Sequence, residues 1–197
     1  MSALPLINAE PPERADAARN RERVLCAAAR LFEERGPDCV TMEAVAAEAG
    51  VGKGTVFRRF GDRAGLARAV ISETESTLQE AMIRGPAPLG PGAAPVERLL
   101  AFGRAYLEFL DVHAPLMLAA EGTAGTWLSS GVYALYRTHV SLLLAQAGCG
   151  TSAAYLADVV MAPLAAPTFG YQRKVRGLSL DEQIEAFEDL VNRLTAR

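Results

Sequence analysis

Residues 41–66 read TMEAVAAEAGVGKGTVFRRFGDRAGL, and this stretch decides the fold of the N-terminal part of the chain. The hydroxyl of Thr41 can accept a hydrogen bond from a free amide of a following first turn, so a helix is expected over 42–48. Gly50 ends that helix, and a second short helix is expected over 53–59. A turn with two glycines separates the two helices, which is the layout of a helix-turn-helix unit.

The second helix of this pair has two chemically different faces. At about 100° per residue, Val56 and Phe60 fall on one face, which should pack inward. The opposite face carries Gly54, Thr55 and Arg58. Such a face can approach a duplex closely, because glycine removes the side chain where backbone must come near another surface. The helix N-terminus offers free amides to a phosphate, and a threonine can reach a base edge.

Positive charge is concentrated in the same region, although the whole chain has a formal charge of −3. Residues 52–68 contain one acid, Asp62, and five cations: Lys53, Arg58, Arg59, Arg63 and Arg68. Five cations minus one acid give a local charge of +4, which is the footprint that binding to a polyanion requires. The alternative is an ordinary solvated helix face, and charge alone does not decide between the two.

Residues 41–66 resemble the helix-turn-helix signature of the tetracycline-repressor (TetR) family of transcription regulators. The matching positions are Thr41, Ala46, Ala49, Gly50, Val51, Gly54, Thr55, Phe60 and Leu66, within a similarity that covers residues 18–70. The resemblance implies an all-α fold: an N-terminal three-helix helix-turn-helix DNA-binding domain and a larger C-terminal helical domain that binds a ligand and dimerises. It also implies a homodimer that binds palindromic operator DNA, usually as a repressor, and releases it when a small-molecule effector binds.

The resemblance also indicates which side chains contact DNA. They are Thr41, Gly52, Lys53, Gly54, Thr55, Phe57, Arg58, Arg59 and Arg63. The lysine and the arginines can neutralise phosphates. Gly52 stands where the family usually has serine and Phe57 where it has tyrosine, so two polar phosphate contacts are lost. The adjacent arginines can compensate, and these departures bear on which operator is recognised.

Proline and glycine divide the chain into parts. We expect a flexible arm over 1–16, the DNA-binding domain over 17–68, and the effector-binding and dimerisation domain over 69–197. The stretch 85–95, GPAPLGPGAAP, predicts a loop, because its four prolines and three glycines cannot form a regular helix interior. Abundant alanine and leucine favour helices elsewhere. Those expected are 16–34, 62–84, 95–112, 114–121, 125–147, 151–172 and 179–195.

Candidate effector-binding residues combine apolar surface with a polar handle on the middle helices. They are Phe102, Tyr106, Phe109, His113, Met117, Trp127, Tyr133, His139 and Met161. Each could also be an ordinary core residue. The last helix begins with a capping box at 179–182 and carries an apolar stripe: Ile184, Phe187, Val191 and Leu194. This stripe could form a four-helix bundle with a second subunit, and packing within one chain is the alternative.

Other functional classes find little support in the sequence. Cys26, Cys39 and Cys149 lack disulfide, redox or metal spacing, and the two histidines form no metal motif, so no metal or cofactor is expected. No catalytic spacing emerges, and GKGT lacks the spacing of a nucleotide-binding loop, so an enzyme is not expected. With no signal-peptide features and no long apolar run, a soluble cytoplasmic protein is expected. The remaining alternatives are an effector-independent DNA-binding dimer and a protein-interaction module.

Overall fold

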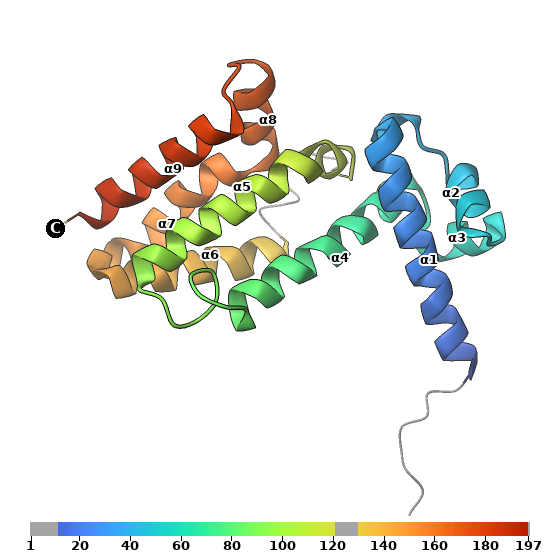
Figure 1. The fold of residues 1–197 in the computed structure, drawn as a ribbon, viewed down its shortest axis with the longest axis horizontal. Helices are drawn as coiled ribbons and strands as arrows, with labels where there is room; N and C mark the ends of the chain where they lie inside the picture. The colour runs from blue at the N-terminus through green and yellow to red at the C-terminus, as the bar shows by residue number, and fades with distance from the viewer. Residues whose placement is uncertain (1–11, 121–129, 197) are drawn as a thin grey trace, which may run out of the picture. The chain divides into compact units, whose positions relative to one another are not determined.

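The structure is a computed structural model that describes residues 12–120 and 130–196. Within these ranges every regular element is a helix, which confirms the predicted all-α class (Figure 1). The chain forms two compact units, one up to Val70 and one from Ile71 onward. The division falls inside a helix, α4 (Arg63–Arg84), which contributes residues to both units.

In the described part of the N-terminal unit, three helices and a short 3-10 turn precede α4. They are α1 (Pro12–Arg35), η1 (Pro37–Cys39), α2 (Met42–Ala49) and α3 (Lys53–Phe60). The sequence placed the start of α1 at Asp16, but the helix begins at Pro12. Proline suits a first turn, because the N–H that it lacks would have no partner there. The end of the expected arm is therefore helical, and residues 1–11 lie outside the described residues.

Three local signals in the sequence set the ends of these helices. The Thr41 hydroxyl accepts a hydrogen bond from the Ala44 amide at 3.1 Å and caps α2. Gly50 ends the same helix with φ of 63°, a left-handed conformation that glycine adopts without a steric penalty. The Asp62 carboxylate accepts a hydrogen bond from the Gly65 amide at 2.7 Å and caps α4. The predicted helix-turn-helix layout is confirmed.

An apolar core holds the N-terminal helices together. Its most buried side chains include Val24, Ala28, Leu31, Val45, Val56 and Leu66. They come from α1, α2, α3 and the first turns of α4, so each helix buries one face against the others. Because Val56 is the buried residue of α3, the packing of this one side chain fixes which face of α3 remains in solvent.

In the C-terminal unit, five helices follow the rest of α4 within the described residues. They are α5 (Pro95–Ala120), α6 (Gly131–Leu144), α7 (Ala153–Met161), α8 (Ala166–Lys174) and α9 (Leu180–Thr195). Short turns of other helix types join α6, α7 and α8: η2 (Ala145–Cys149), η3 (Gly150–Ser152) and η4 (Ala162–Leu164). The loop expected between α4 and α5 is confirmed, and α5 begins at its last proline.

The sequence was wrong about the middle of α5. Separate helices were expected over 95–112 and 114–121, but they form one helix with Pro115 in its interior. Proline removes one backbone hydrogen bond, which normally weakens or kinks a helix. Here the side chains on either side, Ala114 and Leu116, are both buried. Their packing in the core holds the helix together across the proline.

The apolar stretch Gly131–Leu164 is long and apolar enough to cross a membrane by length and composition. No single helix spans it, however, because Gly148 has a non-helical φ of 98° and Pro163 lies in η4. The helices expected over 125–147 and 151–172 are therefore both shorter than expected, and the first residues of the former lie outside the described residues. The 14 residues of α6 and the nine of α7 each fall below the roughly 20 that a spanning helix needs.

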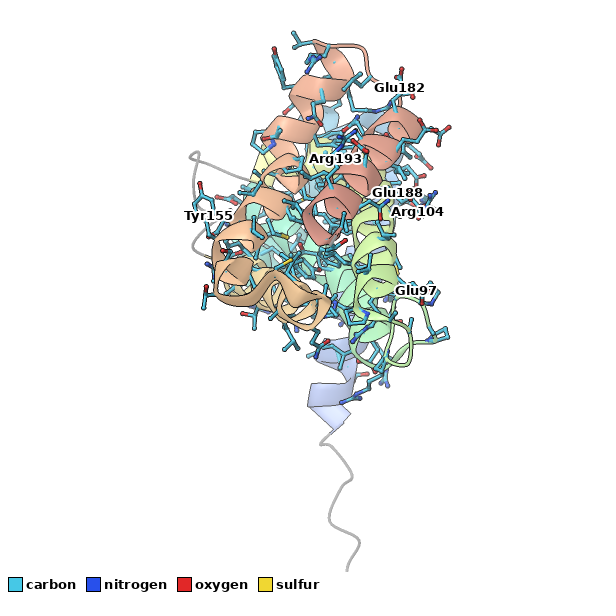
Figure 2. The ribbon with its side chains drawn as sticks, turned by 90° about the vertical axis from the view of Figure 1, so that its left-hand side faces the viewer. Glu97, Arg104, Tyr155, Glu182, Glu188 and Arg193 are labelled. Atoms are coloured by element: carbon cyan, nitrogen blue, oxygen red, sulfur yellow. The ribbon has the colours of Figure 1, made fainter. Side chains whose placement is uncertain are left out.

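The contact between α5 and α9 organises the C-terminal unit. Gly103 of α5 is buried against the ring of Phe187, and a Cβ at this position would collide with that ring. The missing side chain therefore lets the two helices approach closely. Beside this contact, Arg104 and Glu188 form an ion pair at 2.6 Å, and Figure 2 shows the two side chains together on the surface.

The capping box predicted at the start of α9 is also confirmed. The Glu182 amide donates to the Ser179 hydroxyl at 3.1 Å, and the Ser179 amide donates to the Glu182 carboxylate at 2.7 Å. The bond from the Ser179 amide to the carboxylate is the main cause that holds the pKa of Glu182 below its usual value. The two bonds of the capping box also satisfy amides that the first turn of a helix leaves unpaired, so local chemistry fixes where α9 begins.

Candidate nucleic-acid interface

The face of α3 that the sequence analysis assigned to DNA is the face in solvent. Val56 is fully buried and Phe60 is half-buried, so one side of α3 packs on the core. Gly54 and Arg58 are exposed on the other side, and Thr55 is half-buried between the two. The outer face of α3 is therefore available to another molecule.

The N-termini of α2 and α3 differ in how their free amides are satisfied. The exposed Thr41 uses its hydroxyl to bond the Ala44 amide within its own helix. Gly52, at the corresponding position before α3, has no side chain and makes no cap of this kind. The first turn of α3 therefore presents amides and the positive end of the helix dipole to solvent, where an anion such as a phosphate can bind them.

Within the part of the chain that the structure describes, no contact requires glycine at position 54. A Cβ placed on Gly54 would meet none of these residues within 4 Å. Glycine inside a helix costs about 0.5–1 kcal/mol relative to alanine, so the fold would be more stable with alanine here. A close approach to a surface outside the chain gives a physical reason for this glycine.

Lys53 and Phe57 form a combined surface beside the N-terminus of α3. The Lys53 ammonium is paired with the Glu43 carboxylate of α2 and lies 5.4 Å from the centroid of the Phe57 ring. The bond from Lys53 lowers the pKa of Glu43. Both charged side chains are more than half exposed, so the pair contributes little to stability and a phosphate can replace the carboxylate.

Two of the arginines make hydrogen bonds within the N-terminal unit. Arg59 donates to the Ala17 carbonyl of α1 at 3.0 Å. Arg63 donates to the Asp38 carbonyl at 2.8 Å and to its carboxylate at 3.4 Å. These bonds connect α3 to α1 and the start of α4 to η1. Both arginines therefore have a structural role in addition to their charge.

Arg58 differs from these cations, because it makes no hydrogen bond or ion pair with any residue that the structure describes. It lines a hollow of about 520 Å³ between α3 and α1, together with Thr55 and the α1 residues Asn20 and Arg21. The sequence analysis did not select these two α1 residues. Helical spacing could have found them, since they lie one turn before the buried Val24.

The predicted effector residues lie mostly inside the C-terminal unit. Phe102, Tyr106, Phe109, Met117 and Met161 are buried, His113, Tyr133 and His139 are half-buried, and Trp127 lies outside the described residues. Two of them, Phe102 and Tyr106, lie beside Tyr136, which the sequence analysis did not select. The Tyr136 centroid lies 5.5 Å from that of Phe102 and 5.1 Å from that of Tyr106, and the His139 ring lies 5.7 Å from Phe102.

Other members of that set have local partners. The His113 ring lies 4.6 Å from the ring of Phe109. The Tyr133 hydroxyl donates to the Asp158 carboxylate at 3.2 Å, and Arg137 donates to the same carboxylate at 3.0 Å. The bond from Arg137 lowers the pKa of Asp158. The bonds from Tyr133 and Arg137 to Asp158 connect α6 to α7. These contacts give the side chains a structural role.

Two titratable groups beside the aromatic cluster are strongly affected by burial. Glu75 of α4 is buried, and desolvation raises its pKa to about 7. Burial, helped by the charge of Arg98, lowers the pKa of His139 to about 4. The sequence analysis missed Glu75. Glu75 lies one turn after the buried Ile71 and two turns before the buried Met82. An acid on an apolar helical stripe is the sequence signal that could have identified it.

The apolar stripe on α9 packs inside the chain. Ile184, Phe187 and Val191 are buried, and Leu194 is half-buried. The first three therefore pack within the chain, which is the alternative considered for this stripe, and they are not exposed on its surface.

A second hollow, of about 580 Å³, lies between α5 and α8. An ion pair of Arg173 with Asp111, at 2.9 Å, lies at its wall. None of the predicted effector residues that the structure describes lines it. Among the described residues, no group of three or more histidine, cysteine or acidic side chains could hold a metal ion.

Comparison with known proteins identifies the N-terminal region. Residues 24–70 match the family model of bacterial regulatory proteins of the tetR family. An HTH-type transcriptional regulator of Staphylococcus aureus (strain bovine RF122 / ET3-1) is 39% identical over 65 residues, which are 33% of this chain and 35% of that protein. One from strain USA300 is 41% identical over 58 residues, 29% of this chain and 31% of that protein. The chain thus spans about a third of the length of the curated relatives that it matches, and these relatives are regulators, not enzymes.

Solved structures resemble the chain over most of its length. The SmeT–triclosan complex has a TM-score of 0.65 at 18% identity, covering 88% of this chain and 90% of that one. BioQ of Mycobacterium smegmatis has a TM-score of 0.64 at 20% identity, covering 89% and 97%. At these identities the likeness shows the fold alone. Residues 24–70 of the chain are therefore similar to the DNA-binding domain of the tetR family of bacterial regulatory proteins.

Proposed function

We propose that the protein is a transcriptional regulator that binds operator DNA through the outer face of α3. The observation that carries this proposal is the combination of Arg58, an exposed cation with no partner among the described residues, and Gly54, a glycine that no contact with those residues requires. The first supplies charge that is free to bind a phosphate or a guanine edge. The second lets the backbone of α3 come close to the duplex.

The remaining cations support this face in different ways. Lys53 beside Phe57 and the open amides after Gly52 can bind phosphates at the N-terminus of α3. Arg59 and Arg63 keep α3 and α4 in place through their bonds to backbone carbonyls. Asn20 and Arg21 face the same hollow as Arg58 and extend the proposed contact to α1. The face therefore contains both phosphate-binding and base-reading groups.

The regulator acts as a homodimer in this proposal, because two recognition helices can then read the two halves of a palindromic operator. Leu142 of α6 and Tyr155 and Val159 of α7 are large apolar side chains exposed on the C-terminal unit, and Figure 2 shows Tyr155 at its surface. Since the α9 stripe is largely buried within the chain, these residues are the better candidates for contact with a second copy. Light scattering tests this: Tyr155→Glu should yield monomers, whereas Val112→Glu, at an exposed position of α5, should not.

Binding of a small-molecule effector to the C-terminal unit would favour a state that releases DNA, so the protein would act as a repressor in the cytoplasm. The structural neighbour NalD of Pseudomonas aeruginosa, with a TM-score of 0.57 at 18% identity over 90% of this chain and 97% of that one, is the secondary repressor of a multidrug efflux pump. That role belongs to NalD, and it is the kind of function that we propose here. An effector-independent dimer would bind DNA equally well with and without any ligand.

DNA binding is tested by selecting bound duplexes from a random-sequence pool with the purified protein. The proposal expects a palindromic consensus, and tight binding to it that weakens as salt rises. Arg58→Ala should weaken this binding, while Arg84→Ala, which removes an exposed arginine near the end of α4, should not. Recovery of no consensus, or equal effects of the two substitutions, would reject the assignment of α3 as the recognition helix.

A further inference from the structure

Glu43 is an exposed acid among the groups that the proposed function assigns to DNA. It lies in the first turn of α2, two residues after Thr41, which caps that helix. Its carboxylate is paired with the ammonium of Lys53, the first residue of α3. A negative charge on a face that binds a polyanion opposes that binding. The position of Glu43 therefore needs a physical explanation.

The groups around the Glu43 carboxylate are of the kinds that bind a phosphate. The bond from Lys53 is the main cause that lowers the pKa of Glu43, and the backbone amide of Glu43 and the Thr41 hydroxyl act in the same direction. Proteins bind DNA phosphates through ammonium groups, through amides in the first turn of a helix and through hydroxyls. The carboxylate therefore occupies groups that a phosphate oxygen can use in a complex with DNA.

A role in stability alone does not account for this pair. An acid in the first turn stabilises a helix through the helix dipole, but this effect needs no cation on the following helix. The side chains of Lys53 and Glu43 are 60% and 53% exposed, so their pair contributes little to the free energy of unfolding. The pair is open to solvent, and another anion can therefore reach Lys53 and displace the carboxylate.

We propose that Glu43 is an intramolecular competitor of DNA: its carboxylate binds Lys53 in the free protein, and this pair breaks before Lys53 binds a phosphate. Glu43 thereby limits the affinity of the protein for DNA. Because phosphates are the same on every sequence, the competition weakens binding to the operator and to other DNA alike. This inference rests on the proposed function, which places α3 against the duplex, and it describes how binding at that face is regulated.

The test compares the wild type, Glu43→Gln, Lys53→Gln and the double variant. Each is titrated with the selected operator duplex and with a scrambled duplex of equal length, across a salt series. At low salt, Glu43→Gln should bind both duplexes at least about fivefold more tightly than the wild type, and its salt slope should be steeper by about 0.9, the value of one more phosphate contact. Lys53→Gln should weaken binding more in the Glu43→Gln background, where the lysine breaks no pair on binding.

Glu48→Gln is the matched control. Glu48 is also an exposed acid of α2, but it is paired with Arg30 of α1, so its substitution changes the net charge equally and leaves Lys53 paired. At physiological salt, where distant exposed charges are screened, it should change the affinity for either duplex by less than about twofold. All substitutions are at exposed positions and keep most of the side-chain shape, so the variants should fold, and thermal unfolding checks this.

Three results would overturn the inference: no gain in affinity for Glu43→Gln, an equal gain for Glu48→Gln, or the same cost of Lys53→Gln in both backgrounds. The scrambled duplex separates these results from the proposed function. Equal affinity of the wild type for the two duplexes would reject recognition of an operator. The effects of Glu43→Gln on either duplex would still decide whether Glu43 competes with phosphate.

Discussion

The guanidinium of Arg59 donates a hydrogen bond to the backbone carbonyl of Ala17, 3.0 Å away, and so connects α3 to α1. Its neighbour in the sequence, Arg58, bonds to none of the described residues. Two adjacent arginines on one short helix therefore have different roles. Arg59 stabilises the position of the helix, and Arg58 is free to contact another molecule.

Substitution of the two arginines should separate stability from DNA binding. Arg59→Ala should lower the free energy of unfolding by about 1 kcal/mol, because it leaves a carbonyl without its charged donor. Arg58→Ala should change it by less than about 0.5 kcal/mol but should weaken operator binding by about 1–3 kcal/mol if it reads a base. Chemical denaturation and DNA titration measure the two quantities. A destabilisation by Arg58→Ala as large as that by Arg59→Ala would contradict these roles.

Gly54→Ala should have opposite effects on stability and on DNA binding. The added Cβ meets none of the residues that the structure describes, so the variant should be more stable by about 0.5–1 kcal/mol. The same methyl group should prevent close approach of α3 to the duplex and reduce operator affinity at least about tenfold, a cost of about 1.4 kcal/mol. Thermal unfolding and DNA titration of the same preparation measure both. A gain in stability with unchanged affinity would show that position 54 does not face DNA.

Gly103→Ala should destabilise the C-terminal unit, because its Cβ would collide with the Phe187 ring. The cost of such overpacking is about 1–3 kcal/mol. Gly131→Ala provides the control, since a Cβ there would meet no described residue within 4 Å. In the double variant Gly103→Ala/Phe187→Leu, the smaller side chain should relieve the collision. The loss in free energy of unfolding should therefore be smaller than the sum of the losses in the two single variants. Strict additivity in chemical denaturation would argue against a direct contact.

Burial of Glu75 predicts a specific pH dependence of stability. Its pKa is raised from 4.5 to about 7 in the folded protein, so its contribution is fully present below pH 4.5 and is lost as the pH rises to about 7. The wild type should therefore lose about 3 kcal/mol relative to Glu75→Gln over this range. His139, whose folded pKa is lowered to about 4, has the opposite dependence and cancels in the comparison. Equal pH profiles of the two proteins would show that Glu75 is not buried as a lone acid.

Much of the N-terminal unit was predictable, because its signals act over short distances. The Thr41 cap bonds an amide three residues away, the glycine at position 50 ends α2 on its own, and the Asp62 cap also acts within one turn. The spacing of Val56 and Phe60 then determines which face of α3 is exposed. Chemistry within one turn of helix can be read directly from a sequence, and so the outline of the candidate DNA-binding face was available from it.

What the sequence by itself determined was the helical class, the ends of the short helices and the face of α3 in solvent. Only the tertiary structure decided which cations on that face are free, because Arg59 and Arg63 find their partners 42 and 25 positions away. It also decided that α5 continues through Pro115 and that Glu75 is buried with no ion-pair partner among the described residues. The reason is the same in each case. Burial and hydrogen bonding between distant segments override local preference, and both depend on which segments the fold brings together.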